Sequence, residues 1–572
     1  MDLTILLGSI SLVLFQLYPR DFRSRTAISL FGAYLISKGQ LLSWPDSGLS
    51  RPFAALWTLQ FFLEVVWKVV LYPKFFSPLR KLPGPKSGSF FMGNFAEIRR
   101  YPTGIPHRNW INSIPNDGII RYLSLFNMER LLITSPEALR EVLNTKNYEF
   151  QKPYNMRFNL GRILGVGVLL AEGDEHKKQR RDLGPAFKFG HVKNLYPIFW
   201  DKSRECVEAM TEEIQAEARK NTTTDGRPAA VIEVGNWASR VTLDIIGVTG
   251  LGRDFGAIKD PHNELNQTYQ KIFKPTRQGQ ILGTLQLILP APLLDLLPVK
   301  RNLDVHSAAH IIRATCADLI REKKQKLALG EPIAQDILSA ALSSEVFTDE
   351  NLVDQLMTFL AAGHETTASA VTWAVYLLAR HQDVQTRLRT EIHKHIPSIS
   401  KPGATVLHSD IDNMPYLNAV CNEVLRYYSP VPLTLREAAV DTTIMGQKIP
   451  KGTQVMLVPW AVNKSESMWG PDALEFRPDR WMPKYAGDTK AASGSATSNY
   501  SFLTFLHGPR SCIGQQFAKG EFACLVASWV GRFEFELHNK EETDESKIDI
   551  KGGITARPSK GMFVKATVVE GW

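Results

Sequence analysis

The stretch that decides the fold of this chain is Phe505-Leu506-His507-Gly508-Pro509-Arg510-Ser511-Cys512-Ile513-Gly514. Gly508 and Gly514 place no side chain on either side of the cysteine, which allows the backbone to approach a flat partner closely. A helical pattern begins at Gln515, so Cys512 is expected just before a helix N-terminus. Free backbone N–H groups and the positive end of the helix dipole favour the thiolate there. The stretch therefore predicts a cysteine thiolate held beside a flat partner.

The ten residues match the pattern F-x-x-G-x-R-x-C-x-G at every specified position and resemble the haem-binding signature of the cytochrome P450 family. The resemblance implies that Cys512 is the axial ligand of the iron of haem b. It also implies that Phe505 and Gly514 lie beside the haem and that Arg510 meets a haem propionate. A thiolate ligand pushes electron density onto the iron and favours O–O cleavage. Because a lone cysteine is more often a buried structural residue, the expectation rests on the whole pattern.

A helical stripe from Tyr416 to Tyr428 precedes the cysteine by about eighty residues and carries Glu423 and Arg426 three positions apart. Such pairs usually lie on solvated surfaces and contribute little, which is the alternative for this one. The stretch Phe476-Arg477-Pro478-Asp479-Arg480-Trp481 lies between the helix and the cysteine. Together they resemble the family's Glu-Arg-Arg triad, with Arg480 as the second arginine, and the implied role is structural.

A long apolar helix is predicted from Asp349 to about His381, with Thr348 as its N-cap. Its centre reads Ala362-Gly363-His364-Glu365-Thr366-Thr367 and resembles the family's oxygen-activation motif. The resemblance implies catalytic roles for Glu365 and Thr366, whose carboxylate and hydroxyl order water and deliver protons. The alternative is a local bend in which Thr366 bonds back to a carbonyl. His364 occupies a variable position of the motif and is not expected to bind a metal.

Further candidates for the haem propionates come from two other segments that resemble family motifs. Gly173 to Arg181 resembles the C-helix, where His176 stands in place of the usual tryptophan and Gln179 in place of the usual histidine. His176 and Arg180 share a helical face, and both can donate to a propionate; the alternative is an ordinary basic face. In Pro430–Arg436 the resemblance makes Arg436 another partner. The expected substrate pocket consists of Phe359, Ala362, Gly363, Val431, Leu433, Thr434 and Ile554.

Three apolar runs at the N-terminus, residues 3–18, 27–42 and 53–72, predict a membrane anchor of one to three transmembrane segments over residues 1–81. No small-residue cleavage site follows the first run, which favours an uncleaved anchor. Basic residues follow the first and third runs, so by the positive-inside rule three spans place the rest of the chain in the cytosol. One span with interfacial helices is the alternative. Leu82-Pro83-Gly84-Pro85 breaks the helix, and residues 82–572 form the expected haem-thiolate domain.

The bulk composition is that of a globular protein, with 44% hydrophobic and 22% charged residues. The net charge of +9 is spread along the chain and forms no basic arm, so nucleic-acid binding is not expected. The five cysteines form no C-x-x-C pair, which argues against a zinc site or a disulfide framework. The resemblance implies a mainly α fold with a small β portion, the cytochrome P450 fold, preceded by transmembrane helices.

The function implied by the resemblance is that of a haem-thiolate monooxygenase. It inserts one oxygen atom from O2 into a lipophilic small molecule by hydroxylation or epoxidation, in one or several steps. The anchor resembles that of fungal members that decorate terpenoids, polyketides or alkaloids in secondary metabolism. Two alternatives remain open: a haem-thiolate isomerase or dehydratase that needs no external electrons, and a non-catalytic membrane haem sensor.

The chain lacks a G-x-G-x-x-G sequence that opens a helix after a strand, so electrons are expected from a separate protein. The layout resembles endoplasmic-reticulum members that receive electrons from NADPH through NADPH–cytochrome P450 reductase. Cytochrome b5 is a further candidate partner. A basic docking face for an acidic partner is expected from Lys177, Lys178, Arg181 and Lys519.

Overall fold

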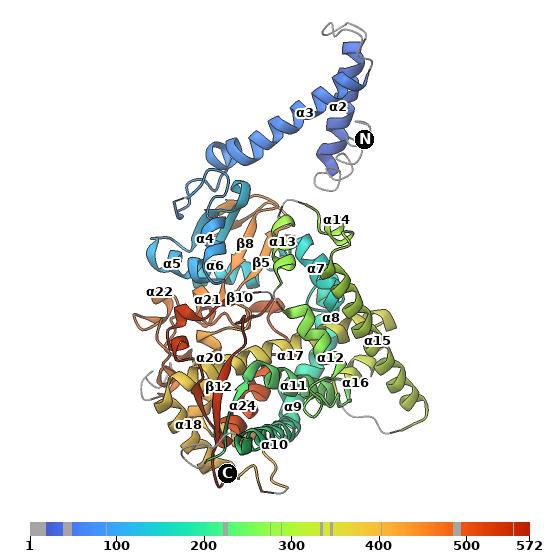
Figure 1. Cartoon of the computed structure of the whole chain (residues 1–572). Coiled ribbons are helices and arrows are strands. Elements are labelled where there is room, and N and C mark those ends of the chain that lie inside the picture. Colours follow the sequence, from blue (N-terminus) through green and yellow to red (C-terminus); the bar gives the residue numbers. More distant parts are fainter. Residues whose placement is uncertain are drawn as a thin grey trace.

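The computed structural model describes residues 19–37, 49–86, 88–220, 227–274, 276–287, 289–331, 336–343, 347–401, 403–483, 493–552 and 554–572. Helices make up most of these ranges, and the strands form small sheets (Figure 1). The predicted fold class, mainly α with a small β portion, is confirmed.

The α-helices in the first half of the body are α4 (Phe95–Arg100), α5 (Ile105–Ser113), α6 (Pro136–Arg140), α7 (Tyr154–Leu164), α8 (Gly173–Leu183), α9 (Phe189–Val192), α10 (Tyr196–Lys220), α11 (Val234–Ile246) and α12 (Glu264–Phe273). Those in the second half are α13 (Arg277–Leu285), α14 (Ala291–Asp295), α15 (Lys300–Ala328), α16 (Ile337–Ser343), α17 (Asp349–Arg380), α18 (Gln382–His395), α19 (His408–Asp412), α20 (Pro415–Tyr427), α21 (Pro459–Val462), α22 (Glu466–Trp469) and α24 (Gln515–Arg532). Short helical turns that bear on the site are η2 (Leu125–Asn127), η3 (Glu141–Thr145), η4 (Gly184–Phe187), η7 (Pro478–Trp481) and η10 (Gly508–Arg510).

The strands are β1 (Ile119–Leu123), β2 (Glu129–Ile133), β3 (Phe150–Gln151), β4 (Ala229–Glu233), β5 (Thr434–Ala438), β6 (Thr442–Ile444), β7 (Gln447–Ile449), β8 (Gln454–Leu457), β9 (Phe533–Leu537), β10 (Ile550–Gly552), β11 (Ala556–Pro558) and β12 (Phe563–Val568). The largest sheet has the order β1-β2-β8-β5-β3, and only its β2–β8 pair is parallel. A second sheet has the order β4-β12-β9, so the last strand of the chain pairs with a strand from its middle. Two hairpins, β6–β7 and β10–β11, complete the β portion.

Helix α17 crosses the middle of the body (Figure 1). The Thr348 hydroxyl accepts a hydrogen bond from the Asn351 N–H at 3.3 Å, which makes Thr348 the N-cap, as predicted. The helix then runs to Arg380, one residue short of the predicted end. Its neighbours α11, α15 and α24 cover it, because it is apolar on most faces.

The hydrophobic core has two parts. The larger part surrounds α17 and includes side chains of α10, α11, α20 and α24. The smaller part covers the five-stranded sheet and includes α6 and α21. The cysteine loop lies where the two parts meet, since Phe502 packs against both.

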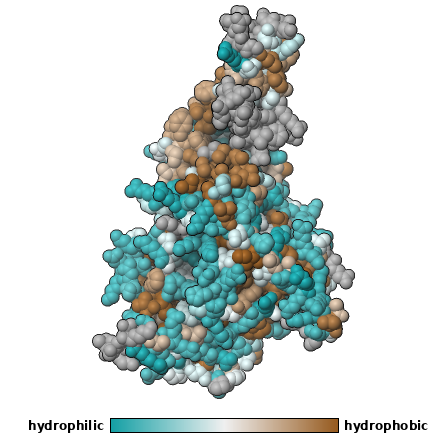
Figure 2. All heavy atoms as spheres, turned by 45° about the vertical axis from the view of Figure 1, so that its right-hand side comes forward, coloured by the Kyte–Doolittle hydropathy of each residue, from teal (hydrophilic) through white to brown (hydrophobic). Residues whose placement is uncertain are grey.

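The N-terminal helices α2 (Pro19–Ser37) and α3 (Ser50–Val66) pack against each other and extend away from the body (Figure 1). Helix α3 continues into the π-helical turn η1 (Trp67–Phe76). Figure 2 shows hydrophobic side chains concentrated on this extension, whereas the visible face of the body is mainly hydrophilic.

Ser50–Phe76 is one helical segment long and apolar enough to cross a membrane, and 6% of its most apolar window is buried. The predicted span 53–72 falls within it. Of the predicted span 27–42, residues 27–37 belong to α2, which does not meet the same test, and residues 38–42 lie outside the described residues. The predicted span 3–18 also lies outside them.

Candidate functional site

The cysteine loop is a tight turn between η10 and α24. The Cys512 N–H donates to the Phe505 carbonyl at 2.9 Å, and the Ser511 N–H donates to the Gly508 carbonyl at 3.0 Å. Gly508 has φ +75°, and a Cβ at this position would clash with the Leu143 carbonyl of η3. A side chain at Gly508 would therefore collide with the chain's own backbone.

Gly514 is less constrained by the protein. A Cβ at Gly514 would lie 3.8 Å from the Phe187 ring, which is ordinary van der Waals contact. The Phe187 ring in turn lies 5.5 Å from the ring of Phe359 on α17. Phe187 thus connects the cysteine loop with the centre of the long helix.

Cys512 differs from the other four cysteines, all of which are buried: Cys206, Cys316, Cys421 and Cys524. Cys512 has exposed surface, and yet burial raises the pKa of its thiol, against the opposing effects of the Gly514 N–H and Arg180. The helix N-terminus was expected to lower this pKa. In the protein alone the effect of burial is larger, and the pKa is raised.

Cations surround this part of the molecule. Arg436 and Lys152 are 3% and 8% exposed, and neither forms an ion pair within the described residues. Burial and the charge of Arg510 lower the pKa of Arg436 to about 10. Burial, Arg436 and Arg510 likewise lower the pKa of Lys152. Buried charges without a counterion are costly. Bound anionic groups would therefore stabilise the cluster of Arg436, Lys152 and Arg510.

The carboxylate of Glu172 lies near these cations and partly offsets their charge. It pairs with the Arg510 guanidinium and accepts a hydrogen bond from the backbone N–H of Lys152 at 2.9 Å. One oxygen of Glu172 and the Nε of Arg510 nevertheless remain buried without a partner. Neither Lys152 nor Glu172 was predicted as a site residue, because an isolated lysine before a proline and a glutamate before a helix belong to no motif.

Helix α8 presents the two predicted residues of the C-helix motif. The Arg180 guanidinium donates to the Ser511 carbonyl at 2.6 Å, which places it against the cysteine loop. His176 is buried, and its Nδ1 lies 3.1 Å from the Tyr148 hydroxyl. Burial and then Arg510 lower the pKa of His176 to about 4, so it is neutral near pH 7 and can donate a hydrogen bond but no charge.

The middle of α17 has one open face. From Gln355 to Ala379 only Ala362, Gly363 and Thr366 are not buried. Positions i and i+4 share a helical face. The Thr366 hydroxyl donates to the Ala362 carbonyl at 2.8 Å, which is the back-bonded geometry considered as an alternative, although the helix continues without a break.

Glu365 lies beside this face but is held by the C-terminal segment. Its carboxylate pairs with Arg557 and accepts the Thr555 hydroxyl at 2.7 Å. Burial raises the pKa of Glu365, although both partners favour its charged form. His364 is buried beside the Tyr269 and Phe273 rings, with Nδ1 2.6 Å from the Leu360 carbonyl.

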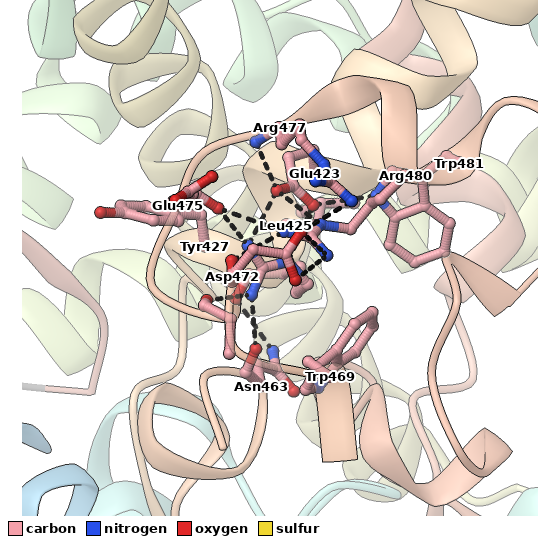
Figure 3. Close-up of polar contacts among 12 residues, drawn as sticks. Glu423, Leu425, Tyr427, Asn463, Trp469, Asp472, Glu475, Arg477, Arg480 and Trp481 are labelled. Carbon is pink, nitrogen blue, oxygen red and sulfur yellow. Dashed lines mark hydrogen bonds and ion pairs between the residues drawn. The ribbon is translucent and has the colours of Figure 1, made fainter. Parts of the chain in front are cut away.

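Glu423, Arg426 and Arg480 meet in a fully buried cluster. Figure 3 shows Glu423 and Arg480 within it. Arg426 makes two hydrogen bonds of 2.8 Å to the Glu423 carboxylate, and Arg480 adds a third at 3.0 Å. Burial alone would raise the pKa of Glu423, but the two guanidiniums outweigh it and hold the pKa below its ordinary value. The remaining Arg426 and Arg480 donors bind carbonyls of the 463–475 segment, so the cluster fastens that segment to α20.

The predicted pocket residues do not all lie in one place, because Ile554 lines a cavity that the other six do not line. Phe359 is buried, Val431 and Leu433 are partly exposed, and the Thr434 hydroxyl accepts from Arg436 at 3.3 Å. Ile554, in contrast, lines a separate cavity between α7 and α13. Of the expected docking residues, Lys519 is partly buried and donates to Asn422 at 3.1 Å, so it does not belong to an exposed face.

These residues fit haem. The accessible thiol of Cys512 would supply a ligand to the iron, and Arg436 and Lys152, which have no carboxylate partner among the described residues, would suit two propionates. The orphaned atoms of Arg510 and Glu172 show that the protein alone does not complete this cluster.

Comparisons with known proteins agree with this geometry. The sequence model of the family described as Cytochrome P450 matches residues 83–565. The chain is 46% identical over 528 residues to cytochrome P450 monooxygenase sphH of Aspergillus fumigatus, covering 91% of this chain and 94% of that one. It is 43% identical to cytochrome P450 monooxygenase ALT8 of Alternaria alternata (89% and 93% covered) and 44% identical to cytochrome P450 monooxygenase FUM15 of Gibberella moniliformis (87% and 90% covered). The signature around Cys512, the fold and these relatives lead to one conclusion: the chain belongs to the cytochrome P450 family of haem monooxygenases.

Proposed function

We propose that this protein inserts one oxygen atom from O2 into a lipophilic small molecule, by hydroxylation or epoxidation, in one or several steps. We further propose a role in fungal secondary metabolism, tailoring a terpenoid, polyketide or alkaloid. The observation that carries the proposal is the accessible Cys512 thiol, joined through Phe187 to the one open face of α17.

Haem b, when bound, supplies the oxygen chemistry, and the protein supplies the surroundings. In this proposal Cys512 binds the iron, with Phe505 and Gly514 beside it. Arg436, Arg510, Arg180 and Lys152 bind the propionates, and neutral His176 donates a hydrogen bond to one of them. The buried position of Arg436 supports this assignment, because a propionate would provide the counterion that it lacks.

Glu365 and Thr366 are proposed to govern proton delivery at the open face. The Thr366 hydroxyl already has a partner in the Ala362 carbonyl, so its oxygen remains free to accept from water. Glu365 is held at Arg557 and Thr555, which places a carboxylate with a raised pKa one residue away. A carboxyl group in that state can hold a proton and release it to ordered water.

Electrons are proposed to come from NADPH through a separate NADPH–cytochrome P450 reductase, with cytochrome b5 as a second partner. Helix α8 exposes Lys177, Lys178 and Arg181 beside the cysteine loop that Arg180 contacts. Lys177 and Arg181 are paired with Asp174 and Asp182, so Lys178 carries most of the net charge of this face. The apolar segment Ser50–Phe76 supports an anchor in the endoplasmic reticulum membrane with the body in the cytosol.

Isotope labelling with oxygen-18 gas tests the proposed reaction. The full chain is reconstituted with a fungal reductase and NADPH, and hexadecanol and hexadecanoate serve as lipophilic probes. A monooxygenase gives products that carry one labelled oxygen atom and that disappear when NADPH is left out. Turnover without NADPH and without label would instead show the isomerase or dehydratase. Spectra that respond to no ligand, without any turnover, would indicate a haem sensor.

A further inference from the structure

A cavity of about 580 Å³ lies at the end of the body that faces α3. Its walls come from α4, α7, the end of α12, α13, α14 and the start of α15, together with Arg130 of β2 and Ile554. In Figure 1, α4, α13 and α14 lie at this end of the body. We call this cavity the outer chamber.

Two wall segments of the outer chamber are also in contact with α17. Leu160 and Ile163 of α7 line it, and the next residue, Leu164, accepts the Thr358 hydroxyl of α17 at 2.7 Å. On the other side, Ile554 lines the chamber, and the hydroxyl of its neighbour Thr555 donates a hydrogen bond to the Glu365 carboxylate of α17. Both wall segments therefore contact the part of α17 that carries the open face.

The lining combines apolar side chains with an excess of positive charge. Its charged members are five cations and one carboxylate: Arg99, Arg130, Arg162, Lys274, Arg301 and Asp295. Asp295 is already paired with Arg162 and His306. Arg301 donates to backbone carbonyls at the end of α12.

Arg130 has no carboxylate partner among the described residues, although its guanidinium interacts with the Tyr122 hydroxyl. It is partly buried, its Nε is buried without a hydrogen-bond partner, and it forms no ion pair within the described residues. Its neighbour Glu129 cannot neutralise it, because successive strand residues point to opposite faces and Glu129 pairs with Arg121 at 2.7 Å. Arg99, at the same chamber, has a single hydrogen bond to the Thr284 hydroxyl at 3.1 Å.

We propose that the outer chamber selects an anionic amphiphile as substrate, with a carboxylate head at Arg130 and Arg99 and an apolar chain directed past Leu160 and Ile163 toward α17. Arginine binds carboxylate through two parallel, charge-assisted hydrogen bonds. A carboxylate would also supply the counterion that Arg130 lacks. The inference rests on the function proposed above and adds the substrate class.

Equilibrium binding of two matched probes tests the proposal. Hexadecanoate and hexadecan-1-ol are titrated into the full-length haem protein in non-ionic detergent, by calorimetry and by the change in haem absorption. Hexadecanoate is expected to bind at least about tenfold more tightly than the alcohol, as charge-assisted hydrogen bonds allow. Arg130→Gln and Arg99→Gln should reduce this ratio, Arg130→Gln to near one. Arg321→Gln removes an equally positive but exposed side chain of α15 and should leave the ratio unchanged.

Equal binding of acid and alcohol in the wild type, or a ratio that Arg130→Gln leaves intact, would overturn the proposal. A lipid headgroup is the other source of an acidic head. If Arg130→Gln weakens binding to phosphatidylserine vesicles while hexadecanoate leaves the haem absorption unchanged, the chamber is a lipid site and the substrate assignment is wrong. The carbon monoxide spectrum of the wild type and of each variant distinguishes failure of the chamber proposal from failure of the proposed function. A thiolate-type band with no acid preference contradicts the chamber alone, whereas its absence in the wild type contradicts the proposed function.

Discussion

Glu423 with Arg426 and Asp174 with Lys177 are both ion pairs three positions apart on a helix, but only the first is buried. Removing one member of a buried pair leaves an uncompensated charge and costs about 3–5 kcal/mol. We therefore expect Glu423→Ala to lower the denaturant midpoint strongly, whereas Asp174→Ala should change it little, because solvent screens an exposed pair. Equal midpoints for the two variants would contradict the structural role of the Glu423 cluster.

His364 makes the stability of the protein depend on pH. Burial lowers its pKa from 6.5 to about 4, with a smaller effect of Arg557 in the same direction. Between these values the unfolded chain binds more protons than the folded one, so His364 reduces stability as the pH falls through this window. His364→Phe keeps a ring beside Tyr269 and Phe273, and should lose less stability than the wild type from about pH 7 to about pH 5. The denaturant midpoint measures this, and the exposed His262→Gln should retain the wild-type dependence.

The roles of single residues were predictable from the sequence where a motif fixes several of them together. Glu423, Arg426 and Arg480 are three such residues, and the structure brings them into contact. Lys152 and Glu172 were not predictable, because their importance comes from charges that only the fold brings near. Lys519 was predicted on an exposed docking face, but it is partly buried. Its position beside the motif gave no information about its burial.

At the scale of elements, the two glycines of the cysteine loop make a matched test. Gly508 has a left-handed conformation that costs other residues about 1–2 kcal/mol, and a Cβ there would also clash with η3. Gly514 has φ −89°, and a Cβ there makes only ordinary contact. We expect Gly508→Ala to lower the melting temperature followed by circular dichroism, and Gly514→Ala to leave it near the wild-type value. A lower melting temperature for Gly514→Ala than for Gly508→Ala would contradict this account of the loop.

Long helices were more predictable than their surroundings. Helix α17 has a capping threonine and a continuous apolar pattern, and both of its ends agree with the sequence within one residue. The same pattern could not show which of its faces stays open. That face is defined by what α11, α15 and α24 cover, and their packing is a property of the fold.

At the scale of the whole molecule, the N-terminal extension provides a test of membrane attachment. Val69 and Pro73 are joined to the body, because their carbonyls accept hydrogen bonds from Asn127 at 2.8 Å and Arg121 at 2.6 Å. Deleting residues 1–66 therefore removes most of the apolar segment and keeps these contacts. We expect the full chain to resist extraction from microsomes by alkaline carbonate and the shortened chain to be released. Release of the full chain would contradict an integral anchor.

The arrangement of the whole molecule was the least predictable from the sequence. The apolar run at residues 53–72 and the helical body were visible in the residue pattern. The outer chamber was not, because its walls come from segments more than four hundred residues apart in the sequence, from α4 to Ile554. Ile554 was predicted to line the substrate pocket, and it lines the outer chamber, which the sequence did not reveal.

The central claim, that Cys512 is the thiolate ligand of a haem iron, is tested most directly by one difference spectrum. The purified full chain is reduced with dithionite and exposed to carbon monoxide, beside Cys512→Ser. Circular dichroism confirms that both proteins are folded. The account predicts a strongly red-shifted Soret band in the wild type that is lost in the variant. A band typical of histidine-ligated haem, or no haem at all in well-folded wild-type protein, would contradict it.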